Sequence, residues 1–487
     1  MMKWVFAVLG SFAIADIHAQ AALQFTGKQA HEDIIYLFQQ IEETHPDLFF
    51  RCTEKDYTLA KNSLISKYSS AASSVATVAQ LNQDISLFLN RIHDGHTNSQ
   101  VSDTANQLRM PFETKLVANR LFIDKILEKS MKVAGKDEII AVNNAPVFDY
   151  LDNRTKYKSF EIYETALDSV ARAFPFKRQH IDSDNMRLTI RKQDDGSQYE
   201  ETVRWGKFGT RKHDMVFLYK PFEFKYLADI GAGYISWNLF FDRKVCEIYL
   251  KNGTLKDTKI TQEQVPDWES FLHDIFNTLR EKNAGYLIID LRNNTGGNST
   301  LGKNLIAFLT DKKIKDYDGY IKLSPLLKKT YGDRFRKIFD TYPIGAKVTD
   351  SQQEEISGEE SVFKELELRK KPESRFAGKV ILLTAYSTYS AAETFTVLMK
   401  DNALGTVVGE PTGNGGNGPI DTLKFNLPNS KIEVHVSFAF RIRPDTDEKC
   451  AKQVEPNIRV SQTVSDYLNN RDTVLELVKQ MILDRKI

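Results

Sequence analysis

The chain has 487 residues, which suggests two to four domains at about 100–200 residues per domain. Apolar residues make up 41% and charged residues 27%, an ordinary balance that excludes disordered, collagen-like and many-span membrane proteins. The 66 basic residues almost cancel the 65 acidic ones, so no global positive field is available to bind nucleic acid.

Cysteine usage excludes two further classes of protein. Cys52, Cys246 and Cys450 are too few and too scattered for a disulfide framework. Neither C-x-x-C nor H-E-x-x-H occurs, so the common zinc signatures are missing. We therefore expect neither a metal ion nor another cofactor.

Residues 1–21 have the pattern of a secretory signal peptide. Met1-Met2-Lys3 is cationic, Trp4 to Ala15 is apolar but too short to span a bilayer, and Ala19-Gln20-Ala21 offers small residues for cleavage. The mature chain is expected to be exported, periplasmic or extracellular, and without a membrane span. A buried first helix and an uncleaved anchor to the envelope are the alternatives.

Residues 22–105 predict a small helical domain. Apolar residues recur at three- and four-residue steps from Ile34 to Ile41, and again from Leu81 to Ile92. The region closes with His93-Asp94-Gly95-His96-Thr97, a polar turn that can present an imidazole. Histidine titrates near pH 6.5, which suits a general base, although a lone histidine is more often structural.

Residues 106–208 predict a compact β-rich module. Gly135 to Val147 has the pattern of a turn, a strand, a tight turn and a second strand. A helical stretch follows near 160–173. Two alternating runs, Arg187 to Lys192 and Tyr199 to Trp205, are then joined by a polar turn and predict a hairpin.

Residues 225–487 predict an α/β domain with a largely parallel core sheet. The apolar runs 286–291 and 380–384 are typical of strands buried on both faces, and a helical pattern follows each of them. The charged segment 311–375 predicts an insertion of loops and local helices.

Ser390 follows the second of these strands and opens a helix. With Glu393 three residues later it matches a helix capping box, which is the structural interpretation. The functional interpretation is a nucleophile at a strand-to-helix turn, where the helix N-terminus and the next backbone amide favour developing negative charge.

Two glycine-rich turns adjoin predicted strands: one follows a strand and the other precedes one. Asp290 to Gly297 leads from a strand through paired glycines into a helix, a geometry that lets backbone amides approach a ligand. Gly413 to Gly418 formally matches G-x-G-x-x-G, but Pro419 and a strand follow it, so we reject a dinucleotide site and expect a flexible loop near an active site.

These motifs together resemble the tail-specific (C-terminal processing) and tricorn-type serine peptidase family. Ile289 to Gly297 is similar to the family's D-L-R-x-N-x-G-G signature, and Ser390 to Glu393 to its S-x-x-E nucleophile motif. Gly409 to Gly413, which reads G-E-P-T-G, is similar to the first part of the G-x-x-T-x-G that follows in the family, and Gly135 to Val147 is similar to a PDZ-like module. The resemblance implies a ClpP/crotonase-like α/β core behind helical and PDZ-like domains.

One departure points to a branch of the family. The best-known branch uses a lysine in a G-K-G loop as the base, but Gly413 to Gly418 contains no lysine, and neither Lys400 nor Lys424 fits. The resemblance therefore implies the His-dependent, tricorn-like branch. In that branch Ser390 is the nucleophile, His96 the base and Glu448, 58 residues after the serine, the supporting acid.

The implied oxyanion donors are the amides of Gly296 or Gly297 and of Ala391. The expected function is that of an exported serine endopeptidase that cleaves extended or unfolded polypeptides through an acyl-enzyme intermediate. The expected partner is thus a polypeptide, not nucleic acid. A non-catalytic protein that binds a peptide or a hydrophobic ligand on the same fold is the alternative, and an esterase is a third option.

Overall fold

The computed structural model describes most of the chain. The described residues are 24–69, 75–101, 108–128, 132–177, 185–208, 220–251, 253, 255, 260–357, 375–447 and 453–487. The expected signal peptide at 1–21, the candidate acid Glu448 and the third cysteine, Cys450, lie outside these ranges. Among the described residues, no helix combines the length and the apolar character that crossing a bilayer requires.

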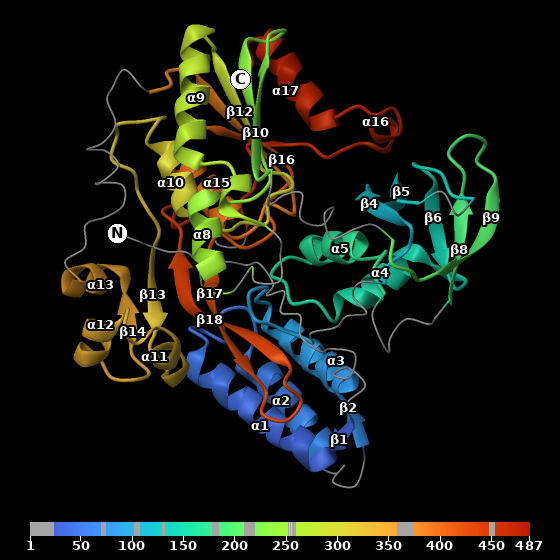
Figure 1. Ribbon diagram of the computed structural model, residues 1–487, viewed down its shortest axis with the longest axis vertical. Helices are drawn as coiled ribbons and strands as arrows, with labels where there is room; N and C mark the ends of the chain where they lie inside the picture. Colours follow the sequence, from blue (N-terminus) through green and yellow to red (C-terminus); the bar gives the residue numbers. More distant parts are fainter. Residues whose placement is uncertain are drawn as a thin grey trace.

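A six-stranded sheet forms the centre of the α/β core (Figure 1), in the order β10-β11-β12-β15-β16-β19. The first pair is antiparallel and all later pairs are parallel, which confirms the predicted largely parallel sheet. Its strands are β10 (Phe222–Leu227), β11 (Ala232–Trp237), β12 (Tyr286–Asp290), β15 (Lys379–Thr384), β16 (Thr406–Gly409) and β19 (Ile458–Arg459).

Helices cover both faces of this sheet, which explains why its strands are apolar almost throughout. Leu287 and Ile289 point into a core shared with α9 (Trp268–Glu281), α10 (Thr300–Ile306) and α15 (Ala391–Asp401). Ile288 points the other way, against α17 (Thr473–Leu483). The short helices α8 (Arg243–Lys251) and α16 (Val464–Leu468) and a 3-10 turn (Gln262–Gln264) lie outside this packing.

A second sheet carries the order β14-β13-β18-β17, with β3 also paired to β18. These strands are β3 (Asn98–Gln100), β13 (Asp318–Lys322), β14 (Lys347–Thr349), β17 (Gly418–Asn426) and β18 (Glu433–Ile442). The charged segment therefore contributes two strands as well as the helices α11 (Pro325–Tyr331), α12 (Arg336–Thr341) and α13 (Asp350–Ser357), where loops and local helices were expected. The strands were not expected because each is short and is flanked by charged residues in the sequence. Strand β13 is instead stabilised by antiparallel pairing with β18, in which Tyr320 lies opposite Phe440.

The N-terminal helices are α1 (Gly27–Thr44), α2 (Glu54–Ser69) and α3 (Val78–Leu89), followed by a 3-10 turn (Asn90–Ile92). A small strand pair, β1 (Gln24–Thr26) and β2 (Val75–Thr77), ties their ends together. Thr26 and Gln29 form a reciprocal capping box that fixes the start of α1. The apolar faces of these helices share one hydrophobic cluster with β17, β18 and α11, so the turn after α3 is held against the second sheet.

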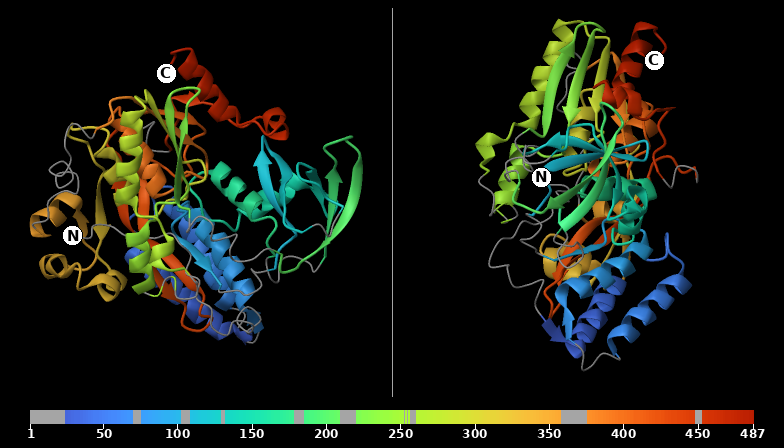
Figure 2. Two further views of the ribbon diagram at one scale, coloured as in Figure 1. Left: turned by 45° about the horizontal axis from the view of Figure 1, so that its top comes forward. Right: turned by 90° about the vertical axis from the view of Figure 1, so that its right-hand side faces the viewer.

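The middle module (Phe112–Arg204) has a sheet and a hydrophobic cluster of its own. Figures 1 and 2 show this module to one side of the α/β core, with its helix α5 on the side that faces the core. Its elements are β4 (Phe112–Val117), β5 (Arg120–Ile126), β6 (Glu138–Val142), β7 (Ala145–Pro146), α4 (Val147–Thr155), α5 (Tyr163–Arg172), β8 (Asn185–Arg191) and β9 (Gln198–Arg204).

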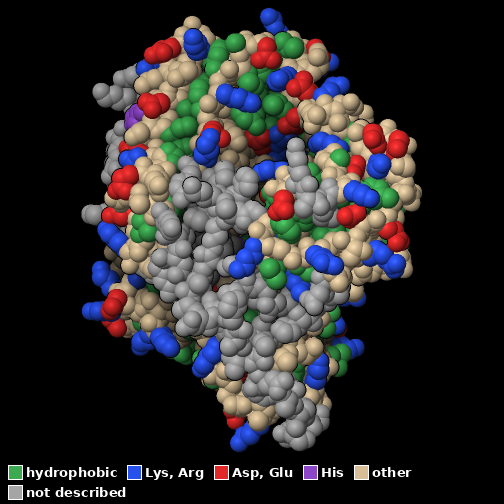
Figure 3. All heavy atoms as spheres, turned by 45° about the vertical axis from the view of Figure 1, so that its right-hand side comes forward, with side chains coloured by type: hydrophobic (Ala, Val, Ile, Leu, Met, Phe, Trp, Pro, Cys, Tyr) green, Lys and Arg blue, Asp and Glu red, His purple; other side chains and the backbone are tan. Residues whose placement is uncertain are grey.

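The surface agrees with the balanced composition. On the face drawn in Figure 3, basic and acidic side chains are interspersed over the module and the core. This pattern gives that face no broad region of a single charge for a polyanion to follow.

Candidate active site

Ser390 stands at the N-cap of α15 in a strained backbone conformation. Its φ of 55° and ψ of −120° lie in a region that non-glycine residues rarely adopt. Such strain at a sharp strand-to-helix turn is typical of exposed nucleophiles in α/β hydrolases. The sequence β15, Ser390, α15 thus presents the hydroxyl beyond the carboxyl edge of the central sheet.

The capping-box interpretation of Ser390 is wrong. The Ser390 side chain makes no cap hydrogen bond, and its backbone N–H donates instead to Asn414 Oδ1 at 3.0 Å. Glu393 turns away and accepts from the Tyr317 hydroxyl at 3.4 Å and from the Asn414 amide at 3.5 Å. Burial raises the pKa of Glu393 well above its ordinary value.

The paired glycines lie directly against the nucleophile. A Cβ on Gly296 (φ 106°) would lie 2.8 Å from the Ser390 Cβ, and one on Gly297 (φ 129°) would lie 2.3 Å from the Phe240 carbonyl oxygen. The N–H of Gly296 already donates to Asn294 Oδ1 at 2.9 Å. The amide of Gly297 is therefore the better placed of the two for a ligand.

The aspartate and arginine of the same motif have an architectural role. The Arg292 guanidinium bonds Asp290 at the end of β12 and Asp472 at the start of α17, at 2.6 to 2.9 Å. The hydroxyl of Tyr234 donates to Asp290 at 2.6 Å. This network fixes the strand end from which the glycine turn departs.

His96 reaches Ser390 from the other end of the chain. The turn after α3 leads into β3, which pairs antiparallel with β18 and so holds the turn over the core. The Nε2 atom of His96 lies 3.4 Å from the Ser390 Oγ, across 294 residues of sequence. Catalytic hydrogen bonds are often this long before substrate binds, so the pair has the geometry of a base and a nucleophile.

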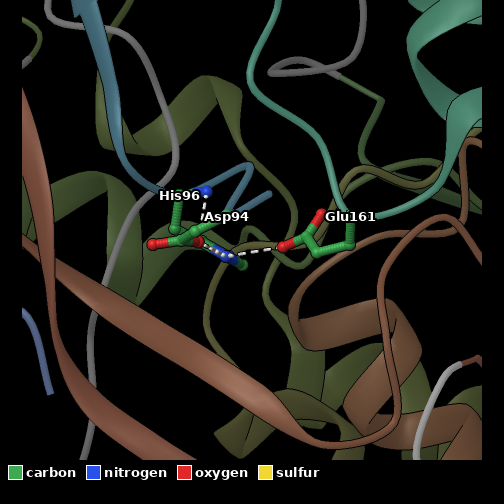
Figure 4. Close-up of side chains that lie close together, drawn as sticks. All are labelled: Asp94, His96 and Glu161. Carbon is green, nitrogen blue, oxygen red and sulfur yellow. Dashed lines mark hydrogen bonds and ion pairs between the residues drawn. The ribbon is translucent and has the colours of Figure 1, made fainter. Parts of the chain in front are cut away.

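Three groups surround the other ring nitrogen of His96. Its Nδ1 atom lies 3.8 Å from Asp94 Oδ1, 3.7 Å from Glu161 Oε1 and 3.5 Å from the Tyr389 hydroxyl. Figure 4 shows Asp94 and Glu161 on different segments with the His96 ring between them. Burial alone lowers the pKa of His96, but the Glu161 and Asp94 carboxylates outweigh it, and the pKa is raised.

Asp94, His96 and Glu161 have ligand atoms within 4.8 Å of one another, a spacing that a divalent cation could accept. Asp94, however, already accepts hydrogen bonds from Thr97 and Ser437 at 2.6 Å and from His45 at 3.1 Å. Its oxygens are occupied by donors, which a metal ion would have to displace. We interpret the group as a hydrogen-bonded network.

The loop 413–418 supports the nucleophile through Asn414 rather than through a base. The backbone N–H of Gly413 donates to the Thr388 carbonyl at 2.8 Å. Lys400 donates to the Glu455 carbonyl at 2.5 Å and Lys424 lies 3.6 Å from Glu433, so both are engaged elsewhere. Neither lysine has the position of a dyad base.

The structure thus brings Ser390, His96, Gly296, Gly297 and Ala391 into one site, while Glu448 lies outside the described residues. Sequence reasoning missed four side chains that complete the site. Asp94 and Tyr389 adjoin predicted residues and Asn414 lies in the glycine-rich loop, so their positions gave a signal. Glu161 lies in no motif, and nothing in the sequence marked it.

Gly95 is the residue that lets this network close, and Gly95→Ala is expected to open it. A Cβ there would lie 2.3 Å from the Tyr389 hydroxyl and 2.8 Å from Glu161 Oε2. Displacing those groups should misplace His96 and lower kcat/KM about 10²-fold. The control is Gly285→Ala, whose Cβ meets nothing within 4 Å; equal activity of the two variants would contradict this role.

Comparison with known proteins agrees with the geometry. Residues 251–460 match the family model described as peptidase family S41. The matched residues include both the Asp290–Gly297 turn and Ser390. No curated protein is significantly similar to the chain in sequence.

One solved structure extends the likeness in fold beyond the residues that the family model matches. Mature CPAF complexed with lactacystin is 17% identical, with 94% of this chain and 99% of that chain covered and a TM-score of 0.66. The photosystem II D1 C-terminal processing protease is 15% identical, with 93% and 97% covered and a TM-score of 0.42. The chain is a serine-type peptidase with the mixed α/β fold of this family, as its motifs predicted.

Proposed function

We propose that this S41 peptidase is an exported endopeptidase that cleaves extended or unfolded polypeptides, with Ser390 as nucleophile and His96 as general base. The observation that carries the proposal is the 3.4 Å separation between Ser390 Oγ and His96 Nε2. Two distant segments meet there, at a strained turn and beside paired glycines. This arrangement favours the His-dependent, tricorn-like branch over one that uses a lysine.

The reaction follows from these positions. Ser390 Oγ attacks the carbonyl carbon of the scissile peptide while His96 Nε2 takes the hydroxyl proton. Collapse of the tetrahedral intermediate breaks the C–N bond, and His96 gives its proton to the leaving amine. Water then cleaves the acyl-enzyme ester, with His96 taking the water proton and returning it to Ser390.

The backbone amides of Gly297 and Ala391 are the proposed oxyanion donors. Ala391 is the first residue of α15, so its amide lies at the positive end of the helix dipole. Gly296 would serve by allowing the turn to approach Ser390, since its own amide is bound by Asn294. Two amides from different turns then converge on the carbonyl oxygen.

Export and the substrate class are further parts of the proposal. The signal-peptide pattern of residues 1–21 supports export to the periplasm or beyond the cell. The PDZ-like pattern of the middle module supports capture of an extended segment by β-augmentation. Glu448 remains the acid implied by the family resemblance.

A non-catalytic binding protein on the same fold is the second candidate, and a fluorophosphonate probe separates the two. An activated serine displaces fluoride and retains the phosphonyl group, so intact mass should rise by one adduct, mapped to Ser390. His96→Ala should label far more slowly, and Ser390→Ala should not label. An unlabelled wild type that binds a peptide or hydrophobic ligand tightly would overturn the peptidase proposal.

A further inference from the structure

Glu161 is a buried carboxylate that the middle module delivers to the catalytic histidine. It lies between α4 and α5, and its side chain is 3% exposed. Its Oε1 atom is 3.7 Å from His96 Nδ1, and both of its oxygens accept from the Tyr389 hydroxyl at 2.9 Å. A carboxylate is costly to bury without a partner, and its neighbours here are the base and the residue before the nucleophile.

Asp94 is nearly as close to His96 but is committed to the fold. Its Oδ2 atom accepts from the Thr97 and Ser437 hydroxyls and contacts His45, and its Oδ1 atom accepts from the His96 backbone N–H at 2.9 Å. These bonds fix the backbone of the turn. The Glu161 carboxylate accepts hydrogen bonds from the Tyr389 hydroxyl. It is therefore the carboxylate that can stabilise a positive charge on the His96 imidazole.

Tyr389 can connect the two residues. Burial, reinforced by the Glu161 charge, raises the pKa of Tyr389 well above its ordinary value, so the hydroxyl keeps its proton. It can accept a hydrogen bond from His96 Nδ1–H while it donates to Glu161. That arrangement selects the tautomer in which the Nε2 lone pair faces Ser390 Oγ.

We infer that Glu161 is a positioning residue of the peptidase site, which acts with Tyr389 to orient His96 and to balance the imidazolium that forms during catalysis. The inference rests on the function proposed above. It gives a residue of the middle module the role that the family resemblance implies for Glu448.

The module is seated so that Glu161 stays in place. Thr165 Oγ1 donates to the Gly413 carbonyl at 2.8 Å, and the Arg172 guanidinium donates to Ser387 Oγ at 3.1 Å. At the far end, the Tyr467 hydroxyl of α16 donates to Asp124 at 2.7 Å. Through Thr165 and Arg172, α5 is joined to the loop 413–418 and to the turn that leads into Ser390, so the site is complete only when the module is docked.

Among the described residues, the carboxylates that act most strongly on His96 are Glu161 from the module, Asp94 in its own turn and Asp421 on β17, which lies 3.7 Å from Arg441. The Tyr389 hydroxyl before α15 also faces its Nδ1 atom. Removing one negative charge from this set should lower the pKa of His96. The acid limb of the pH–rate profile should then move to lower pH.

The test compares full-length wild type with Glu161→Gln. We expect kcat/KM to fall about 10²-fold and the acid limb to shift to lower pH. The His96 pKa, read from imidazole nitrogen resonances by NMR, should fall with it. If Glu161 only stabilised the fold, its replacement would reduce the rate but would not move the acid limb of the pH–rate profile.

Three variants complete the design. Glu161→Asp should recover part of both effects, and Glu164→Gln, an exposed residue in the first turn of α5, should change neither. Glu448→Gln should retain the wild-type limb. The inference is overturned if the acid limb and the His96 pKa do not move in Glu161→Gln, or if they move only in Glu448→Gln. A wild-type protein without turnover would instead overturn the proposed function. The NMR titration of His96 would still decide on Glu161 in that case.

Discussion

Ser390→Ala is expected to lower kcat/KM by roughly 10⁴- to 10⁶-fold, because losing the nucleophile of a triad removes nearly all of its chemistry. The free energy of unfolding should change by less than about 1 kcal/mol. The Ser390 hydroxyl caps no helix amide, and alanine inherits the same backbone strain. Steady-state peptide hydrolysis and chemical denaturation measure the two quantities separately.

Ser324→Ala is the matched control for this experiment. Ser324 does cap its helix, since its Oγ accepts from the Leu327 N–H at 3.0 Å at the start of α11. We expect this variant to lose about 1 kcal/mol of stability and to keep its turnover. If Ser390→Ala instead behaves like Ser324→Ala, Ser390 is a structural residue and the proposed mechanism fails.

The contrast between these two serines shows what could be predicted from sequence. A serine followed three residues later by glutamate fits a capping box and a nucleophile equally well, because both need a strand-to-helix turn. The deciding feature is the backbone conformation of Ser390, with φ 55° and ψ −120°, and it depends on contacts with Gly296 and Asn414. Those contacts bring together residues far apart in the chain, and no local pattern encodes them.

The central sheet was predictable because its strands carry a local signal. Strands covered on both faces are apolar throughout, and each is followed by a helix with its own periodicity. The strand at Asp318–Lys322 lacks that signal because its two buried residues, Gly319 and Ile321, are separated by a partly buried tyrosine and flanked by charged residues. Glu161 is the extreme case, since its position depends on how the module docks against the core.

Asp94→Asn is expected to destabilise the protein by about 2–5 kcal/mol and to lower kcat/KM as well. Asp94 is 1% exposed. It accepts hydrogen bonds from the His96 backbone N–H in its own turn and from the Ser437 hydroxyl on β18. It also contacts His45 at the end of α1. An asparagine at this position would place its NH₂ group where one carboxylate oxygen of Asp94 now accepts hydrogen bonds. The partners would lose their acceptor, and the His96 turn would lose its anchor to the second sheet.

The pH dependence of stability gives this prediction a second readout. Burial raises the pKa of Asp94, but hydrogen bonds from His45 and Ser437 and the nearby histidines outweigh it, so the pKa lies below its ordinary value. A carboxyl whose pKa is lowered by folding stabilises the protein above its unfolded pKa of about 3.9, and that stabilisation is lost as the pH falls towards the folded pKa. The advantage of wild type over Asp94→Asn in denaturant titrations should therefore be full at pH 7 and should shrink below about pH 4. An advantage that stays constant over this range would mean that Asp94 contributes through its shape and not through its charge.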